Sequence, residues 1–439
     1  MRAFPSGPEN PPMRHYFLFL AFVLPVTWAC SPPEPVQEVR HSGELQSQAP
    51  PITVSAADWP WWRGLAHDNH AVGPNPPTEI NEQAILWQAE IPGLGHSTPI
   101  LVGEKLFLTT AVESAETQSL LAFDAATGAK LWSIPVHEGK FMNMHQKNSQ
   151  ASATPATDGT NIYTVFMVND GIWASAVSQE GKILWQKQAG PFRSQHGYGS
   201  SPLIHESLLI IQADCDGSGF VAALDRGSGE IIWRTSRPQG NSYGTPTIAQ
   251  IAGRAQLVLC GQDRLDSYDP NTGELIWYFE GLADTIANTP QVVGDTVYAS
   301  GGYPDHFVIA IRADGTGQLD QSHVIWQERK KVYVPSLLVD RDCVYAFGDD
   351  GVAVCYDAET GDEHWKKRLG GDFSASATLI GDLIYVPNEA GEMFVLKTGP
   401  KFEQVSSGKL TGAGFASPVI VDGRIYWRTS THLYCLAGR

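Results

Sequence analysis

The chain has 439 residues with 43 Gly and 13 Trp, and its 30 Lys and Arg against 47 Asp and Glu give a formal net charge of −17 at pH 7. This length suits one large domain built from repeats, and the glycine content suits a turn-rich all-β protein. Because the charge is strongly negative, we expect no nucleic-acid partner.

The first segment is typical of an export signal. Arg14 precedes an apolar run over 16–26, which is too short to span a membrane as a folded helix and ends shortly before Cys30. The arrangement resembles a bacterial lipoprotein signal, in which Cys30 becomes the lipidated first residue, although the residues just before it depart from the usual Leu and small residue. Ordinary secretion with cleavage near Ala29, or further on, is the alternative. Met13 is a second possible start of the chain.

Three further segments follow the signal peptide, which we assign to 1–29. Residues 30–57 are rich in Pro, Glu, Gln and Ser, and we expect a disordered tether. Residues 58–80 contain three Trp in four positions, which would be costly to expose. We therefore expect a latch or plug packed on the rest of the chain, in preference to a carbohydrate-binding surface. Residues 81–439 form the main domain.

One pattern recurs along this domain: an apolar strand ending in Asp, a Thr-Gly turn, and a second strand that closes on Trp. The clearest copy is 356–365, and others lie at 123–132, 176–185, 224–233, 268–277 and 310–326. Asp can accept hydrogen bonds from the backbone of the turn, and Gly tolerates positive φ, so each copy predicts a hairpin. The Trp supplies a large apolar area for packing on a neighbouring unit.

A second pattern precedes each hairpin. A Ser-Pro or Thr-Pro pair opens a short apolar strand, and a tight turn and a strand with a central Tyr follow. The pairs lie at 98–99, 154–155, 201–202, 245–246, 289–290 and 417–418, with degenerate versions at 334–336 and 376–378. Each unit thus has four antiparallel strands, A to D, at a period of roughly 40–50 residues, which predicts a β-propeller.

The number of strands fixes the expected number of blades. Strand A and strand C each occur eight times, and the last strand C, at 433–436, has no strand D after it. A single D-like strand containing Trp87 stands before the first strand A. We therefore predict an all-β, eight-bladed propeller whose ring is closed by pairing of the Trp87 strand with the C-terminal blade.

The sequence offers few signs of a catalytic or metal site. Residues 214–217 resemble the start of a calcium loop but lack the later ligands, so a turn is expected. The His residues lack zinc-site spacing, and no Gly-x-Ser-x-Gly elbow is present. The cysteines show no disulfide framework; Cys343 and Cys355 lie on one predicted hairpin and are either a disulfide or buried free thiols. We expect no catalytic residue and no metal ligand.

The candidate binding region is the face that carries the long D–A and B–C connections, the longest being 135–150. The opposite face has short, uniform turns, and binding residues usually lie on loops held by a rigid scaffold. The candidate rim residues are His145, Asn148, His196, Tyr198, Tyr243, Lys331 and Tyr333. The alternative is that these side chains satisfy strand-end backbone groups and channel waters.

The Ala-x-Asp-x-x-Thr-Gly-x-x-x-Trp repeat resembles the pyrroloquinoline quinone (PQQ) propeller repeat, which quinoprotein alcohol dehydrogenases share with the BamB scaffolds of outer-membrane assembly. The Trp-Pro-x-Trp-Arg-Gly segment, with 196–202 and 431–435, is similar to PQQ-like propellers of planctomycete-type bacteria. The dehydrogenases hold PQQ under a disulfide between adjacent cysteines and coordinate Ca²⁺ with Glu, Asn and Asp. This sequence has no Cys-Cys pair, and those ligand positions have no clear counterpart.

The resemblance therefore favours a non-catalytic scaffold without a cofactor. We expect a monomer that binds other envelope proteins on the periplasmic side, attached to the outer membrane through a lipid at Cys30; Ser31 is compatible with outer-membrane sorting. A PQQ-dependent dehydrogenase with calcium, or a propeller that binds a small ligand in its central channel, is the alternative.

Overall fold

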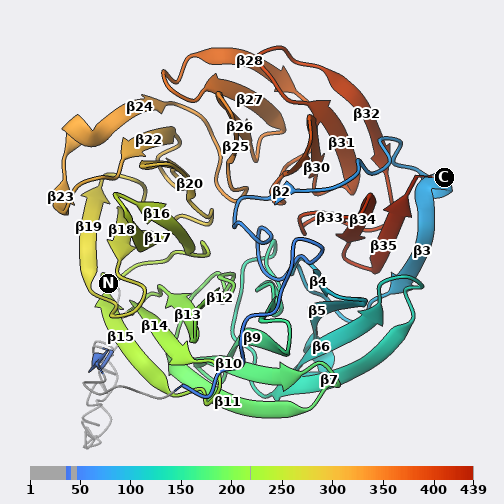
Figure 1. Cartoon of the computed structure of the whole chain (residues 1–439), viewed down its shortest axis with the longest axis vertical. Coiled ribbons are helices and arrows are strands. Elements are labelled where there is room, and N and C mark those ends of the chain that lie inside the picture. Colours follow the sequence, from blue (N-terminus) through green and yellow to red (C-terminus); the bar gives the residue numbers. More distant parts are fainter. Residues whose placement is uncertain (1–35, 41–46, 218, 439) are drawn as a thin grey trace, which may run out of the picture. The chain divides into compact units, whose positions relative to one another are not determined.

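The computed structural model describes residues 36–40, 47–217 and 219–438, and these ranges contain eight mainly antiparallel sheets arranged around a central channel (Figure 1). The helices in these ranges are three 3-10 turns, η1 (Glu82–Ala84), η2 (Glu113–Ala115) and η3 (Gln321–His323). Within the described residues no helix has the length and apolar character needed to cross a membrane. The predicted signal peptide and Cys30 lie outside the described residues.

We number the blades from the N-terminal side of the ring, with strands given from the channel outwards. Blade 1 holds β4 (Ile100–Val102), β5 (Lys105–Val112), β6 (Thr117–Asp124) and β7 (Lys130–Glu138); blade 2 holds β8 (Ala156–Thr157), β9 (Asn161–Val168), β10 (Gly171–Ser178) and β11 (Ile183–Pro191). Blade 3 holds β12 (Leu203–His205), β13 (Leu208–Ala213), β14 (Gly219–Asp225) and β15 (Ile231–Arg237); blade 4 holds β16 (Thr247–Ile251), β17 (Arg254–Gly261), β18 (Arg264–Tyr268) and β19 (Leu275–Glu280).

The second half of the ring repeats the same order. Blade 5 holds β20 (Gln291–Val293), β21 (Thr296–Ser300), β22 (Val308–Arg312) and β24 (Val324–Glu328); blade 6 holds β25 (Leu338–Asp340), β26 (Cys343–Phe347), β27 (Val352–Asp357) and β28 (Glu363–Arg368). Blade 7 holds β29 (Thr378–Ile380), β30 (Leu383–Pro387), β31 (Glu392–Lys397) and β32 (Gln404–Lys409); blade 8 holds β33 (Val419–Val421), β34 (Arg424–Arg428), β35 (His432–Ala437) and β3 (Ile85–Glu90). The predicted all-β, eight-bladed fold is confirmed.

Blade 8 joins the two ends of the domain. Strand β3 pairs antiparallel with β35, and Trp87 lies opposite Cys435. This is the pairing predicted for the Trp87 strand, and it leaves the eighth sheet with four strands like its neighbours.

In six of the eight blades the repeated Trp ties the blade to the next one. Its indole N–H donates to a backbone carbonyl in the C–D turn of the following blade, at 2.9 to 3.1 Å; the pairs are Trp87–Ala125, Trp132–Gln179, Trp185–Arg226, Trp233–Pro270, Trp326–Ala358 and Trp365–Gly399. Eight apolar clusters fill the spaces between neighbouring sheets, one for each pair of blades. The stabilising apolar core is therefore distributed around the ring.

Three sheets gain a fifth strand from segments outside the four-strand unit. Strand β1 (Val39–Arg40) pairs antiparallel with β15, β23 (Gly317–Leu319) lies parallel to β19, and β2 (His70–Ala71) lies parallel to β29. Residues 47–57 also contact the ring, since the Thr53 N–H donates to the Asp158 carbonyl at 2.8 Å. The expectation of a disordered tether over 30–57 is therefore wrong for 36–40 and 47–57, because backbone pairing with blades 2 and 3 orders them.

The described cysteines and the Asp214 region play structural roles. Cys215, Cys260, Cys343, Cys355 and Cys435 are buried free thiols. Asp214 lies in the connection between β13 and β14, as the turn interpretation predicted, and its buried carboxylate pairs with Arg237 at 2.6 Å.

Candidate functional site

A belt of hydroxyl groups surrounds the central channel, with one residue from each Ser/Thr-Pro signature or its degenerate copy. The belt consists of Thr98, Thr154, Ser201, Thr245, Thr289, Ser336, Ser376 and Ser417. In six steps around the ring, the backbone N–H of one belt residue donates to the hydroxyl of the next blade, at 2.9 or 3.0 Å. The hydroxyl is thus needed to satisfy a buried backbone donor, which explains why Ser or Thr recurs there.

Six of the eight belt residues, all except Thr98 and Ser417, line a cavity of about 560 Å³, which occupies the central channel. The remaining wall comes from the D–A connections and includes the side chains of His96, His145, His196, Tyr243 and Phe415. Trp62 lines the cavity as well, and its indole N–H donates to the Thr289 hydroxyl at 2.9 Å.

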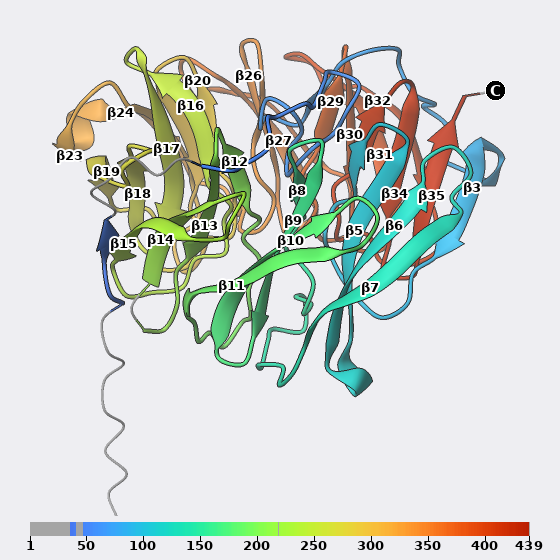
Figure 2. The same ribbon diagram turned by 60° about the horizontal axis from the view of Figure 1, so that its bottom comes forward.

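Trp62 belongs to the segment 58–71, which runs across the middle of the ring (Figure 1). The backbone of Trp59 pairs with Leu101 of blade 1, and the guanidinium of Arg63 donates to the Leu337 carbonyl, in front of blade 6, at 2.9 Å. In Figure 2 this dark blue segment lies at the upper face, whereas the β5–β6 connection points to the lower face. The segment therefore closes one end of the channel, and the D–A loops surround the other end.

The longest connection forms a strap over the open end. In this strap, which we define as residues 139–148, Lys147 pairs with Asp372 at 3.0 Å and with Glu389 at 2.9 Å, both on the blade 7 side of the mouth. Burial alone would lower the pKa of Lys147, but the hydrogen bonds and charges of the two carboxylates outweigh it, and the net shift is upward. The pairs hold the strap against the far wall.

Five of the seven predicted rim residues meet at this cavity: His145, Asn148, His196, Tyr243 and Tyr333. The imidazoles of His145 and His196 stack with ring centroids 5.7 Å apart, and His196 lies 6.0 Å from the Tyr243 ring. The Asn148 side-chain amide donates to the His196 carbonyl at 2.7 Å and so joins two D–A connections. Desolvation raises the pKa values of Tyr243 and Tyr333, the latter to about 12, so both phenols are neutral donors at neutral pH.

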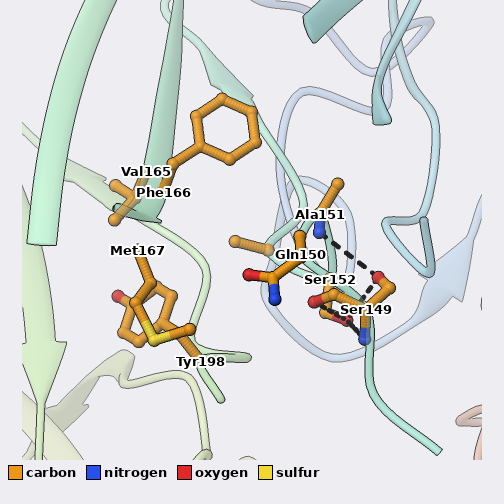
Figure 3. A pocket seen from close by; sticks show the side chains of 9 residues that line it. Ser149, Gln150, Ala151, Ser152, Val165, Phe166, Met167 and Tyr198 are labelled. Carbon is orange, nitrogen blue, oxygen red and sulfur yellow. Dashed lines mark hydrogen bonds between the residues drawn. The ribbon is translucent and has the colours of Figure 1, made fainter. Parts of the chain in front are cut away.

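The other two predicted residues do not line the cavity. Tyr198 is buried between blades, where its ring lies edge-on to Phe192 and its hydroxyl donates to the Gln212 carbonyl at 3.0 Å. Figure 3 shows Tyr198 beside Met167 and Gln150, in the wall of a separate hole of about 10 Å³. Lys331 is exposed and is not among the lining residues, whereas the neighbouring Lys330 is buried and pairs with Asp350 at 2.9 Å.

Several lining residues were absent from the predicted set. His96 and Phe415, from D–A connections at the two ends of the repeat array, stack with centroids 4.3 Å apart. Desolvation lowers the pKa of His96 to about 3, and the charge of Arg428 adds to this effect, so the imidazole is neutral. The sequence predicts only a packing role for Trp62, because the Trp-rich motif does not show which indole enters the channel.

The donor set of the cavity does not fit a calcium-bound quinone. Ca²⁺ needs six to eight oxygen ligands, usually including carboxylates, but the described lining residues include no Asp or Glu. Throughout the described part of the chain, no group of three or more His, Cys, Asp or Glu side chains is arranged to hold a metal ion. The wall instead offers hydroxyls, imidazoles, phenols and an indole.

Comparisons with known proteins agree with this architecture. The family model described as "Outer membrane protein assembly factor BamB" matches residues 78–197, 117–346, 172–400 and 320–434. A polyvinylalcohol dehydrogenase of Pseudomonas sp is 23% identical over 320 residues, covering 60% of this chain and 47% of that protein. A BamB of Shewanella oneidensis is 23% identical over 323 residues, covering 70% of this chain and 76% of that protein.

The fold match extends to a solved structure. The crystal structure of BamB from Moraxella catarrhalis superposes with a TM-score of 0.59 at 15% identity, covering 81% of this chain and 99% of that one. The chain spans less than half the length of the polyvinylalcohol dehydrogenase that it matches.

Proposed function

The chain belongs to the family described as outer membrane protein assembly factor BamB, and from this membership we propose that it is a non-catalytic scaffold of the cell envelope. In this proposal a lipid at Cys30 holds it on the periplasmic side of the outer membrane as a monomer. Its partners are envelope proteins, including those that assemble outer-membrane β-barrels.

The observation that carries the proposal is the pairing of β1 with the outer edge of blade 3. Val39 lies opposite Arg234 and Arg40 opposite Trp233, and the Arg40 guanidinium donates to the Arg234 carbonyl at 2.9 Å. An extended segment from outside the repeat therefore adds a strand to this edge. Addition of a partner strand to an exposed sheet edge is a common mode of protein recognition.

The outer edges of other blades are also free to accept an added strand. The outer strands of blades 1, 2, 5, 6, 7 and 8 have no fifth strand within the described residues. Several carry an exposed apolar side chain next to or near the docking Trp position; these are Leu86, Leu131, Leu184, Ile325 and Val405, with exposed fractions between 38% and 53%. Unpaired edges with exposed apolar side chains favour strand addition from a partner.

Site-specific photo-crosslinking in the encoding organism tests the proposal. A photoreactive residue at Leu131 or Leu184 should yield adducts with components of the outer-membrane assembly machinery, identified by mass spectrometry. Val72, exposed at 64% but outside the outer strands, is the matched control. Deletion of the gene should also lower the levels of outer-membrane β-barrel proteins; unchanged barrel levels together with no rim adducts would refute the scaffold.

A second candidate is a PQQ-dependent dehydrogenase, favoured by the similarity to polyvinylalcohol dehydrogenase. Purified mature protein would be titrated with PQQ and Ca²⁺ and assayed for dye reduction with a panel of alcohols and sugars. Stoichiometric binding with turnover would establish this candidate and overturn the scaffold. The absence of carboxylates from the described cavity lining leads us to expect neither binding nor turnover.

A further inference from the structure

We propose that the central cavity binds a small neutral saccharide, an activity separate from the scaffold role. The cavity is closed at one end by Trp62 and spanned at the other by the strap, and its volume of about 560 Å³ lies within the usual range for small-molecule sites. Its wall combines a ring of hydroxyls with aromatic side chains, and each feature restricts the chemical class of ligand that can bind.

The hydroxyl belt provides hydrogen-bond donors. Thr154, Ser201, Thr245, Ser336, Ser376 and Ser417 each use an Oγ lone pair to accept a backbone N–H from the adjacent blade. Among the described residues these six hydroxyls only accept hydrogen bonds, and none of them donates its own proton to a protein acceptor. Five of the six residues, all except Ser417, line the cavity, so their O–H groups are available to a ligand oxygen.

The charge of the lining restricts the ligand further. The described lining residues include no carboxylate, and the ammonium group of Lys147 is already paired with Asp372 and Glu389. His96 is neutral because its pKa is lowered to about 3. An anion would lack a free counter-charge and a cation would lack a carboxylate, so a neutral ligand fits best.

Aromatic side chains supply the apolar part of the wall. Trp62 lies at the closed end, and Tyr243, Tyr303, Tyr333 and Phe415 line the sides. A pyranose ring has an apolar C–H face that packs on such rings and hydroxyls at its edge that accept from the belt. A flat aromatic ligand without hydroxyls would pack equally well but would leave the belt protons unpaired, which costs affinity.

Calorimetric titration of the purified mature protein tests this assignment. The probes are a panel of neutral mono- and disaccharides, with glucuronate as the anionic and indole as the hydroxyl-free aromatic comparison. We expect at least one neutral saccharide to bind at one site per chain and to bind at least tenfold more tightly than glucuronate or indole. Failure of the whole neutral panel to bind, or preferential binding of glucuronate or indole, would overturn the proposal.

Paired variants locate the binding site. Trp62→Ala and Ser201→Ala should weaken saccharide binding by roughly three- to tenfold or more, whereas Trp62→Phe, which keeps an aromatic ring, should lose less. The controls are Thr164→Val and Trp173→Ala, which remove a buried hydroxyl without a partner and a half-buried indole, neither of them lining the cavity. Thermal melts identify any variant that is unfolded. Equal loss in the control variants, or no loss in folded Ser201→Ala, would place the ligand elsewhere and refute the site.

Discussion

Gly128 lies directly beneath the indole of Trp87, which belongs to the preceding blade of the ring. Its φ is +73°, and a Cβ built on it would lie 2.4 Å from Trp87 Cε3. Alanine at this position must therefore tolerate a left-handed backbone and displace a docked indole. The repeat thus needs glycine for two independent reasons.

Gly103 allows these two effects to be separated. It also has a positive φ, +56°, but a Cβ there would meet nothing within 4 Å. We expect Gly103→Ala to destabilise the protein by about 1 kcal/mol through backbone strain alone. Gly128→Ala should cost about 1–3 kcal/mol more because of overpacking. Urea unfolding of both variants measures the difference, and equal losses would show that the indole does not restrict this turn.

Titration of His67 should make the stability of the protein depend on pH. Its ring stacks on Trp61 at 5.2 Å, and desolvation, with help from the charge of Arg63, lowers its pKa from 6.5 to about 4. The unfolded chain therefore takes up this proton at a higher pH than the folded chain. Stability from this group is complete above about pH 6.5 and is lost as the pH falls towards 4, by at most about 1.4 kcal/mol per pH unit.

The substitution His67→Asn tests this linkage. Asn tolerates the left-handed backbone at this position, where φ is +58°, and it does not titrate. The difference in unfolding free energy between the wild type and the variant should shrink as the pH falls from 6.5 to 4. A difference that is constant over this range would contradict the lowered pKa.

For single residues, the sequence predicted those of the turns better than those of the candidate site. Asp124 and Thr127 form the expected turn, with the Asp124 carboxylate accepting from the Thr127 N–H at 2.8 Å. Tyr198 was misplaced because it lies in a connection, where no strand alternation indicates the direction of a side chain. Its burial depends on Phe192 and Gln212, which only the folded chain brings near it.

The strap is the element whose mobility the structure restrains most visibly. Lys147 makes the two ion pairs that hold 139–148 to the blade 7 side of the mouth. We expect Lys147→Met to raise amide hydrogen exchange in the strap by roughly two- to tenfold, because partly exposed pairs are worth about 0.2–1 kcal/mol each. High salt should produce a similar change in the wild type.

Lys105→Met is the matched control for the strap. Lys105 makes one long pair with Glu180 at 3.8 Å on a different connection. Its replacement should leave exchange in the strap unchanged. Equal exchange in Lys147→Met and the wild type would mean that backbone contacts alone, such as the Gly139 N–H bond to the Glu116 carbonyl at 3.1 Å, position the strap.

Among the elements, the repeated strands were predictable and the added strands were not. The Asp-containing turn and the Trp recur at the same spacing in blades 1, 3, 4 and 6, so each of these blades supports the assignment of the others. Strands β1 and β2 have two residues each, too few for any period to be detected. Their positions are set by the free edges of β15 and β29, which exist only after the ring has formed.

Closure of the ring depends on one non-covalent seam, the pairing of β3 with β35. In the other blades the outer strand continues the chain of its own sheet, whereas β3 reaches blade 8 from the opposite end of the sequence. Backbone pairing with β35 and docking of Trp87 on the Ala125 carbonyl at 3.1 Å hold it there. The same strand continues backwards into the segment that closes the channel, so loss of the seam would affect both the ring and the candidate cavity.

Two tryptophans with matched surroundings test the importance of this seam. Trp87 and Trp365 are both 8% exposed, and each indole donates at 3.1 Å to the next blade. Replacement by Ala should cost about 3–5 kcal/mol of local packing at either site. Only Trp87→Ala should also release β3 and accelerate hydrogen exchange in β33–β35, because β28 remains tied to its blade by a short turn. Equal protection of β35 in the two variants would show that backbone pairing alone closes the ring.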